Sequence, residues 1–457
     1  MKAQARDLLG RRNILKSSAA VLGGAFGVGA IPESPLAEAY PQNLNTNSGP
    51  SGLRITDLRI AVLTKAPFTC PLIRLDTNQG IYGLGEVRDG ASPTYALFLK
   101  SRLLGENPCN VDRVFRKIKQ FGGHARQGGG VSGVEMALWD LAGKAYNVPV
   151  YQMLGGKFRD RIRIYADTTE SRDPKVYAGR LKERMDHGLS WLKMDLGYDL
   201  VGSAAETVTQ PSGLSREEQA FTPHMFNAIE LTDKGIAMMA DYVAQVREIV
   251  GMEIPLSADH FGHIGVNSCI RLGRALEKYN LSWLEDMIPW QYTDLWKRIT
   301  DSINLPTLTG EDIYLKENFK VLCENHAVSK IHPDLATAGG ILETKKIGDM
   351  AQEYAVPMAM HFAGSPVSCM ASVHCAAASE NFLALENHSL EVPWWDDLAE
   401  GVEKPIVNRG YITVPNKPGL GVTLNEDAVK KHLAPGAGYF EPTTEWDKER
   451  SWDRLWS

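Results

Sequence analysis

Three predicted core strands of this 457-residue chain each end on a carboxylate. Asp259 lies at the end of IPLSADH, Glu285 at the end of LSWLED, and Glu311 at the end of LPTLTGED. If these strands are parallel neighbours, their carboxyl ends open into one mouth, where three anionic groups would repel one another. A hard divalent cation relieves that repulsion, and oxygen ligands suit Mg²⁺ or Mn²⁺. Single carboxylates often cap helices instead, but three adjacent strand ends favour a metal site.

Polar residues also lie at the ends of other predicted strands. Lys193 and Asp195 in WLKMDL are two residues apart, so their side chains share one face of a strand. Asp334 in HPDLATAGG and His361 in MHFAG end consecutive strands, where the aspartate can orient the imidazole and raise its basicity. A lone core histidine is usually structural, but the Asp334 partner favours a catalytic role. Glu386 in LALENHS is either a further catalytic residue or a structural hydrogen-bond acceptor.

The elements that must position these residues are short strands alternating with helices. We predict strands at residues 162–169, 191–196, 254–260, 281–287, 306–312, 330–335, 357–363 and 383–389. Eight β–α repeats predict an α/β fold with a closed (β/α)8-type barrel, a modified TIM barrel. A doubly wound open sheet is the alternative, but polar residues at the ends of evenly spaced strands favour the barrel.

An N-terminal α+β domain precedes the barrel, because GVEMALWDLAGKAYNV has helical periodicity and follows predicted strands. The predicted organisation is a signal peptide at 1–39, a linker at 40–54, the α+β domain at 55–160, the barrel at 161–400, a C-terminal segment at 401–433 that returns to the α+β domain, and a Trp-rich tail at 434–457. An insertion at 198–232 interrupts the barrel, and it is either a lid or specificity loop or an oligomer contact.

The N-terminus carries the features of a targeting segment. In RRNILKSSAAVLGGAFGVGA, Arg11 and Arg12 precede a weakly apolar stretch rich in Gly and Ala, which indicates a twin-arginine export signal. Ala37 and Ala39 offer a small-x-small cleavage site. We therefore expect a periplasmic mature protein that starts near Tyr40; a basic N-terminal helix or anchor is the alternative.

The composition excludes several classes of protein. The formal net charge is −6, and no basic stripe indicates binding to nucleic acid. No apolar run after the N-terminus is long enough to span a bilayer, so we expect no membrane segment in the mature form. The six cysteines are scattered without metal-type spacing, which favours buried apolar thiols.

Taken together, these residues resemble the enolase superfamily, specifically the mandelate racemase/muconate lactonizing enzyme-like branch that includes acid-sugar dehydratases. The likeness covers residues 55–433 and includes LIRLDTNQGIYGLGE, ALWDLAGKAYNVPVYQMLGGKFRDRI and YITVPNKPGLGV. The resemblance implies that residues 55–160 cap the barrel, with loops near 66–70 and 88–94 setting specificity. It also implies one Mg²⁺ (or Mn²⁺) per subunit, an Asp–His dyad at Asp334 and His361, and a homo-oligomer, either a dimer or an octamer.

The resemblance further implies a mechanism. A carboxylate substrate binds the metal, a base removes the proton α to that carboxylate, and the metal stabilises the resulting enediolate. A general acid then either reprotonates carbon or helps a β-hydroxyl leave as water.

One departure from this branch bears on the reaction. The branch often carries Lys-x-Lys on its second strand, with the second lysine as a base, whereas Asp195 occupies that position here and can pair with Lys193. A racemase needs a proton acceptor on each face of its substrate, while a dehydratase can use His361 for both proton transfers. The departure favours dehydration of a sugar acid, an aldonate or aldarate, to a 2-keto-3-deoxy acid.

A second departure is the string ADHFGH. His260 and His263 are candidate substrate contacts, or His260 orients a ligand, and ordinary loop polarity is the alternative. Tyr198, at the start of the insertion, is a further candidate for substrate binding.

Two other functional hypotheses stay open. A racemase or epimerase would use Lys193 or another group on the opposite face, and a cycloisomerase or lyase would act on another carboxylate. A non-catalytic periplasmic sugar-acid binding protein is also conceivable, but the complete set of carboxylates and the Asp334–His361 pair argue against it.

Overall fold

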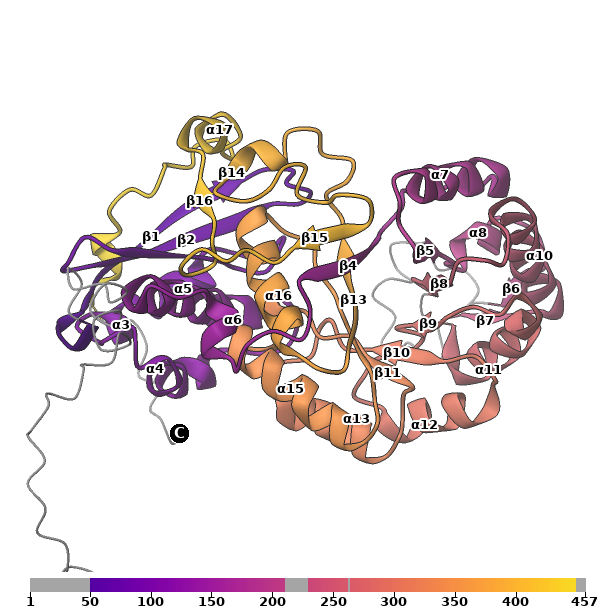
Figure 1. The fold of residues 1–457 in the computed structure, drawn as a ribbon. Helices are drawn as coiled ribbons and strands as arrows, with labels where there is room; N and C mark the ends of the chain where they lie inside the picture. Colours follow the sequence, from indigo (N-terminus) through magenta and orange to yellow (C-terminus); the bar gives the residue numbers. More distant parts are fainter. Residues whose placement is uncertain (1–49, 210–228, 262–263, 449–457) are drawn as a thin grey trace, which may run out of the picture. The chain divides into compact units, whose positions relative to one another are not determined.

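The structure is a computed structural model that describes residues 50–209, 229–261 and 264–448 (Figure 1). The predicted signal peptide, most of the predicted linker, His263, the middle of the insertion and the end of the tail lie outside the described residues. Within these ranges, no helix combines the length and the hydropathy needed to cross a membrane.

The N-terminal domain is a three-stranded antiparallel sheet covered by helices. Its strands are β1 (Ile55–Leu63), β2 (Cys70–Thr77) and β3 (Tyr82–Glu86), in the order β1-β2-β3. The predicted helix is α5 (Gly129–Tyr146), and it lies directly on β3, because a Cβ on Gly85 would meet the carbonyl oxygen of Gly133 at 2.0 Å. The smaller helices are α2 (Thr94–Leu97), α3 (Lys100–Leu103), α4 (Val111–Ile118) and α6 (Val150–Met153).

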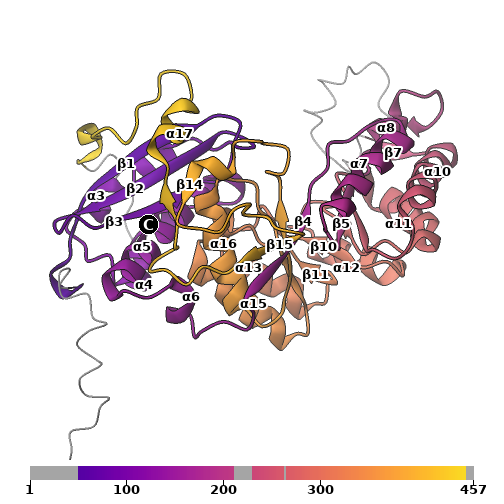
Figure 2. The same cartoon turned by 45° about the horizontal axis from the view of Figure 1, so that its top comes forward.

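Eight parallel strands form the second domain, and the pairing of β13 with β4 closes them into a barrel. They are β4 (Arg161–Ala166), β5 (Leu192–Asp195), β8 (Leu256–Asp259), β9 (Leu284–Glu285), β10 (Thr307–Thr309), β11 (Lys330–Ile331), β12 (Met358–Met360) and β13 (Phe382–Asn387). Figure 2 labels β4, β5, β10 and β11 of this barrel. Each of the eight strands overlaps one of the segments predicted from the sequence. The closed barrel is therefore confirmed, and the open doubly wound sheet is wrong because such a sheet would leave β4 and β13 as unpaired edges.

Helices follow the first seven barrel strands. They are α7 (Pro174–Asp186), α10 (Asp233–Val250), α11 (Gly265–Leu276), α12 (Thr293–Ser302), α13 (Lys316–Glu324), α15 (Ile341–Glu353) and α16 (Pro366–Ala378), with the short α14 (Leu335–Ala338) before α15. The N-termini carry the expected capping residues: Asp173 accepts from the N–H of Lys175, and Ser365 from that of Val367. Both helices have proline at their first position, where its missing N–H costs nothing.

The described ends of the insertion form α8 (Asp199–Gly202) and the antiparallel pair β6 (Val208–Thr209) and β7 (Glu230–Leu231). Short 3₁₀ turns complete the chain at η2 (Pro50–Gly52), η3 (Lys119–Phe121), η4 (Ala125–Gly128), η6 (Glu277–Tyr279), η7 (Asp396–Leu398) and η8 (Thr444–Trp446).

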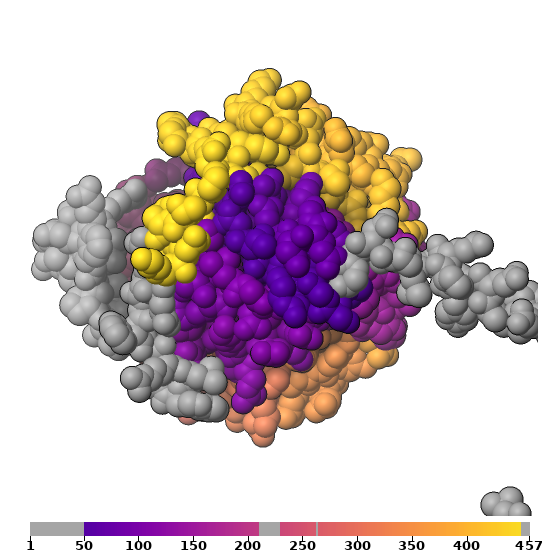
Figure 3. All heavy atoms as spheres, turned by 90° about the vertical axis from the view of Figure 1, so that its left-hand side faces the viewer, coloured from indigo at the N-terminus to yellow at the C-terminus, as the bar shows by residue number. Residues whose placement is uncertain are grey.

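After β13 the chain returns to the N-terminal domain. It forms β14 (Ala399–Glu400), β15 (Tyr411–Thr413), β16 (Thr423–Leu424) and α17 (Glu426–Lys431), and β15 pairs antiparallel with β4. The described part of the predicted tail lies along β1, where the N–H of Phe440 donates to the carbonyl of Ile60 at 3.0 Å. Figure 3 shows this C-terminal segment in yellow against the indigo N-terminal domain. The buried ammonium of Lys100 joins them, because it lies 2.6 Å from Asp447 and 2.9 Å from the carbonyl of Thr443.

One packing feature bears on the site. A separate apolar cluster belongs to the barrel strands and the residues that flank them: Tyr165, Trp191, Trp283, Leu308, Ala359 and Ala384. Indole and phenol groups of this cluster reach the polar residues at the strand ends; for example, the Trp283 indole donates to Glu285 at 2.9 Å.

All six cysteines are free thiols and five of them are buried, in agreement with the interpretation from spacing.

Candidate functional site

Carboxylates from three strands surround the ammonium group of Lys193. Its Nζ lies 2.6 Å from Asp259 Oδ2, 2.7 Å from Glu386 Oε1 and 3.5 Å from Glu285 Oε1. Burial opposes the charge of Lys193, but these carboxylates outweigh it and raise the pKa of the ammonium well above its usual value. These contacts favour the charged form of Lys193.

The expected pair between Asp195 and Lys193 does not form among the described residues. Asp195 instead binds His260, whose Nδ1 lies 2.9 Å from Asp195 Oδ1 and 3.5 Å from Asp259 Oδ2. The hydrogen bond to Asp195, with the charge of Asp259, raises the pKa of His260 to about 10. The register explains this arrangement, because Asp195 lies opposite Asp259 on β8, so its carboxylate meets the residue that follows β8.

His361 and Asp334 form the dyad that the sequence predicts. His361 Nδ1 lies 2.5 Å from Asp334 Oδ2, and its Nε2 lies 3.3 Å from Glu311 Oε2. Burial lowers the basicity of the ring, but Glu311 and Asp334 raise the pKa of His361 to about 9 against the opposing charge of Arg88. Because Nδ1 is committed to Asp334, Nε2 is the atom available for proton transfer.

Arg88 is a site residue that the sequence analysis missed as such, although it lies in the 88–94 loop assigned to specificity. Its guanidinium is 1% exposed and reaches across from the N-terminal domain to the barrel. Nη1 donates to the carbonyl of Glu311 at 2.9 Å and lies 3.4 Å from Asp334 Oδ2, while Nη2 lies 3.3 Å from Glu311 Oε1. One arginine thus contacts both the dyad and a predicted metal ligand. No sequence signal marks these contacts, since they join residues 223 positions apart.

His332 is a second missed residue, and it is fully buried below the strand ends. Its Nδ1 lies 2.9 Å from Glu285 Oε1, and its Nε2 lies 2.6 Å from the hydroxyl of Tyr165 and 3.4 Å from Glu386 Oε2. Burial disfavours its charge, but Glu285 and Glu386 raise the pKa of His332 well above its usual value. A signal was present, because His332 precedes Asp334 by two positions and so shares its strand face.

His388, which follows β13, is a third missed residue. Its Nδ1 lies 3.4 Å from Asp167 Oδ2 and its Nε2 lies 3.3 Å from Glu386 Oε1. Its ring centroid is 5.5 Å from that of His361. A second imidazole therefore lies next to the dyad.

Two of the three predicted metal ligands, Glu285 and Glu311, lie in one group that could hold a metal ion, and Asp259 lies in another. Glu285 and Glu311 offer oxygens that lie, with a nitrogen of His332, within 4.8 Å of one another. Asp259 belongs to a neighbouring group with Asp195 and His260, and it shares Lys193 with Glu285. The negative charges of these carboxylates also act on Asp286. Its carboxyl pKa is raised well above its usual value, first by burial and next by the charges of Glu311, Asp259 and Glu285. Anionic oxygen donors that repel one another in this way suit Mg²⁺ or Mn²⁺.

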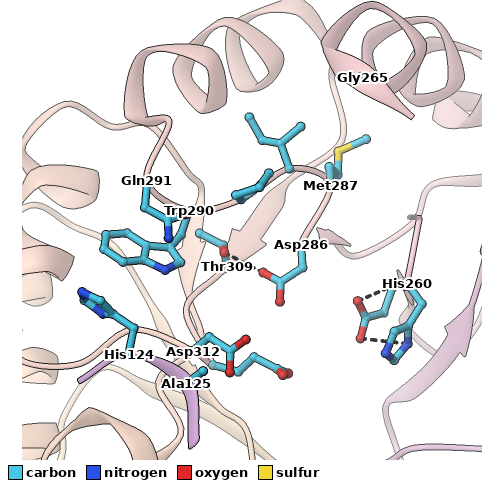
Figure 4. Close-up of a pocket in the computed structure, with 14 residues that line it drawn as sticks. His124, Ala125, His260, Gly265, Asp286, Met287, Trp290, Gln291, Thr309 and Asp312 are labelled. Atoms are coloured by element: carbon cyan, nitrogen blue, oxygen red, sulfur yellow. Dashed lines mark hydrogen bonds and ion pairs between the residues drawn. The ribbon is translucent and has the colours of Figure 1, made fainter. Parts of the chain in front are cut away.

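A cavity of about 460 Å³ opens at this rim (Figure 4). Its walls are the ends of β8, β9 and β10 and the segment around His124 of the N-terminal domain. The lining residues are His124, Ala125, Asp259, His260, Gly265, Asp286, Met287, Ile288, Pro289, Trp290, Gln291, Thr309, Glu311 and Asp312. Of the predicted substrate residues, His260 lines the cavity. Tyr198 lies at the start of α8 and is not among the lining residues, and His263 lies outside the described residues.

Two family descriptions match the chain. The mandelate racemase / muconate lactonizing enzyme N-terminal domain matches residues 50–155, and the enolase C-terminal domain-like description matches residues 177–428. The chain is 36% identical to D-xylonate dehydratase of Haloferax volcanii over 406 residues, or 87% of this chain and 93% of that protein. It is 28% identical to D-galactonate dehydratase of Pectobacterium atrosepticum over 371 residues, or 78% of this chain and 89% of that protein.

Solved structures agree with these matches. A mandelate racemase/muconate lactonizing enzyme-like protein from Rubrobacter xylanophilus has a TM-score of 0.76 and 31% identity, covering 85% of this chain and 100% of that one. A member of the enolase superfamily from Salmonella Typhimurium has a TM-score of 0.71 and 27% identity, covering 83% of this chain and 98% of that one. The resemblance inferred from sequence is thus confirmed: this chain belongs to the enolase superfamily, in its mandelate racemase and muconate lactonizing enzyme group, and is an enzyme of the lyase or racemase type.

Proposed function

We propose that this enzyme dehydrates a sugar acid, an aldonate or aldarate, to a 2-keto-3-deoxy acid. The observation that carries the proposal is the oriented dyad of His361 and Asp334 beside the carboxylate ring, where the ammonium of Lys193 is already paired with three carboxylates. Relatives named as D-xylonate and D-galactonate dehydratases support a sugar acid as the substrate class.

Asp259, Glu285 and Glu311 would hold the divalent cation, which we propose to be Mg²⁺ or Mn²⁺. When bound, it supplies positive charge beside the substrate carboxylate, where negative charge develops during the reaction. Neutralising Glu311 would also remove the largest of the charges that keep a proton on His361. Lys193 keeps Asp259 and Glu285 facing one point, and Arg88 fixes one oxygen of Glu311.

His361 then performs both proton transfers. Its Nε2 takes the proton from the carbon α to the carboxylate, and the electron pair of the broken C–H bond stays on the substrate. The same Nε2 next gives its proton to the β-hydroxyl, the C–O bond breaks, and water leaves. The enol that remains becomes the 2-keto acid by tautomerisation. Asp334 keeps the Nδ1–H end of the ring in place through both steps.

The test is a screen of aldonic and aldaric acids with the purified protein and Mg²⁺, with keto acid measured as its semicarbazone. We expect 2-keto-3-deoxy product that disappears on chelation and returns when Mg²⁺ is added back. Turnover that is indifferent to chelation, or a complete lack of product across the screen, would contradict the proposal.

The same reaction in D₂O separates dehydration from racemisation. His388, next to His361, is the imidazole that a two-base mechanism could recruit. Recovered substrate with deuterium at the α-carbon and both configurations, without loss of water, would favour a racemase or epimerase over the dehydratase.

A further inference from the structure

We infer that one end of the cavity is a subsite for the uncharged hydroxyl chain of the substrate, and that this subsite selects aldonates over aldarates. The distal subsite consists of His124, Ala125, Trp290, Gln291 and Asp312. The inference rests on the proposed function and specifies which class of sugar acid the site accepts. Figure 4 shows His124 and Trp290 together at one end of the cavity and His260 at the other.

The N-terminal domain is fastened to the barrel at this subsite. The N–H of Ala125 donates to the carbonyl of Asp312 at 2.8 Å, and the hydroxyl of Tyr314 donates to the carbonyl of Lys119 at 2.7 Å. The contact is close enough to require glycine, because a Cβ on Gly122 would lie 2.4 Å from the Tyr314 ring. The subsite is therefore held in place before any ligand enters, which lowers the entropic cost of recognition.

His124 presents a defined hydrogen-bond donor. The backbone N–H of Tyr314 donates to its Nδ1 at 3.2 Å, so Nδ1 is the acceptor nitrogen of the ring. The proton of a neutral imidazole must then be on Nε2, which can donate to an oxygen of the ligand. Burial lowers the pKa of His124, which agrees with a neutral ring.

Trp290 supplies the apolar wall. Its ring centroid lies 4.6 Å from that of His124, at an interplanar angle of 53°. Met287, Ile288 and Pro289 precede it and also line the cavity. An indole face packs well against the C–H groups of a hydroxylated chain, while the hydroxyls project toward polar neighbours. This arrangement suits a polyol tail rather than a bare carboxylate.

The charge distribution excludes a second carboxylate. No lysine or arginine is among the residues that line the cavity in the described part of the chain, whereas Asp259, Asp286, Glu311 and Asp312 all are. His260, at the opposite end, is paired with Asp195. The distal carboxylate of an aldarate would face Asp312. Arg88 Nη2 lies 3.9 Å from Asp312 Oδ1, but this arginine is already shared with Asp89, Glu311 and Asp334, so it offsets little of the repulsion. A terminal hydroxyl would instead donate to Asp312 and accept from His124.

The experiment compares matched pairs that differ only at the distal carbon: D-galactonate with galactarate, D-gluconate with D-glucarate, and D-xylonate with xylarate. With the Mg²⁺-loaded enzyme, we expect kcat/KM for the preferred aldonate to exceed that for its aldarate by about 10-fold or more. Calorimetric binding of the same pairs should show the same order. If an aldarate has a kcat/KM equal to that of its matched aldonate, the inference is overturned and the dehydratase proposal is left intact.

Absence of any turnover would defeat the dehydratase proposal, but the binding comparison would still decide the inference. Equal or tighter binding of the aldarates would then overturn it.

Variants locate the selection in the distal subsite. Trp290→Ala and His124→Gln should raise KM for the aldonate by about 10-fold, with a smaller change in kcat, because they act on the tail rather than on the reacting carbon. Asp312→Asn should lower the ratio of kcat/KM for the aldonate to kcat/KM for the matched aldarate. His187→Gln, a surface histidine after α7, is the matched control and should change neither parameter. Unfolding curves confirm that each variant folds. The assignment of the distal subsite would be overturned if folded Asp312→Asn kept the wild-type ratio of aldonate to aldarate kcat/KM and Trp290→Ala kept the wild-type KM.

Discussion

Two regions of this protein control the charges of their buried carboxylates in opposite ways. In the barrel mouth, burial opposes ionisation, but Lys193 holds the pKa of Glu386 well below its usual value, and His361 and Arg88 do the same for Glu311. At the contact between the domains, burial prevails. It raises the pKa of Glu86 to about 7 and that of Glu135 to about 8.

The partners explain the difference. Glu135 accepts hydrogen bonds from the indole of Trp139 at 2.7 Å and from the backbone N–H groups of Ile341 and Leu342 at the start of α15. Glu86 accepts from the backbone N–H and hydroxyl of Ser365 at the start of α16. These donors are neutral, so they hold the two domains together without stabilising the charge as a lysine or arginine would.

Glu311 and Glu386, whose pKa values are lowered, are thus the carboxylates that have cations beside them. Glu86 and Glu135, which also link the two domains, are held by neutral donors.

The largest effect is expected for Glu285→Gln. The change removes one charge from the proposed metal site and also one partner each of Lys193 and His332. We expect the loss of tight Mg²⁺ binding in calorimetry and a decrease in turnover of about 10³-fold or more. Glu324→Gln, on the exposed end of α13, is the matched control. Normal turnover in folded Glu285→Gln would remove this residue from the metal site.

His361→Asn should abolish exchange of the α-proton and lower kcat by about 10²–10⁴-fold, because it removes the nitrogen that we propose for both transfers. Mg²⁺ affinity should stay within a few-fold, since Glu285 and Asp259 keep their contacts. Mass spectrometry of substrate recovered from D₂O, together with a metal titration, measures both. If turnover survives, the base is another group, and His388 becomes the first candidate.

Arg88→Gln should lower kcat by about 10-fold to 100-fold, because the guanidinium fixes Glu311 and Asp334 together. It should also reduce the free energy of unfolding by about 3–5 kcal/mol, since a buried ion network loses its central cation. Arg88→Lys should recover only part of both losses, because an ammonium cannot reproduce the forked geometry. Denaturant unfolding and steady-state kinetics are the measurements. Arg113→Gln, which is 74% exposed in its side chain, should behave as wild type.

The smallest effect concerns the neutral-donor region and appears as a pH dependence of stability. The pKa of Glu86 is raised from 4.5 to about 7, so the folded chain binds this proton more strongly than the unfolded chain does. The resulting stability is fully present below pH 4.5 and is lost as the pH rises through about 7. Glu86→Gln should remove this decline, which amounts to at most about 3 kcal/mol.

Thermal unfolding of wild type and Glu86→Gln from pH 4 to pH 8 measures the difference, with Glu183→Gln on the surface of α7 as the control. If the unfolding temperatures of Glu86→Gln and wild type change with pH in parallel, Glu86 is ionised in the folded protein at neutral pH.

The order of amino acids was enough to predict the barrel strands and the polar residues at their ends. Asp259, Glu285 and Glu311 follow short apolar segments, and in any parallel barrel the ends of such segments share one mouth. The spacing of Asp334 and His361 likewise placed them on consecutive strands, where the structure joins them at 2.5 Å. These features follow from local alternation and strand order, which a sequence records directly.

The pairing of the charged residues, in contrast, could be read only from the folded protein. From the sequence, Asp195 was a candidate partner for Lys193. In the register that β5 adopts beside β8, however, Asp195 contacts His260 and Lys193 contacts Asp259. Arg88 enters the site only because the N-terminal domain rests on the barrel. The physical reason is that electrostatic partnership depends on distances of a few ångströms between segments far apart in the chain, and those distances exist only after the barrel has closed and the two domains have packed together.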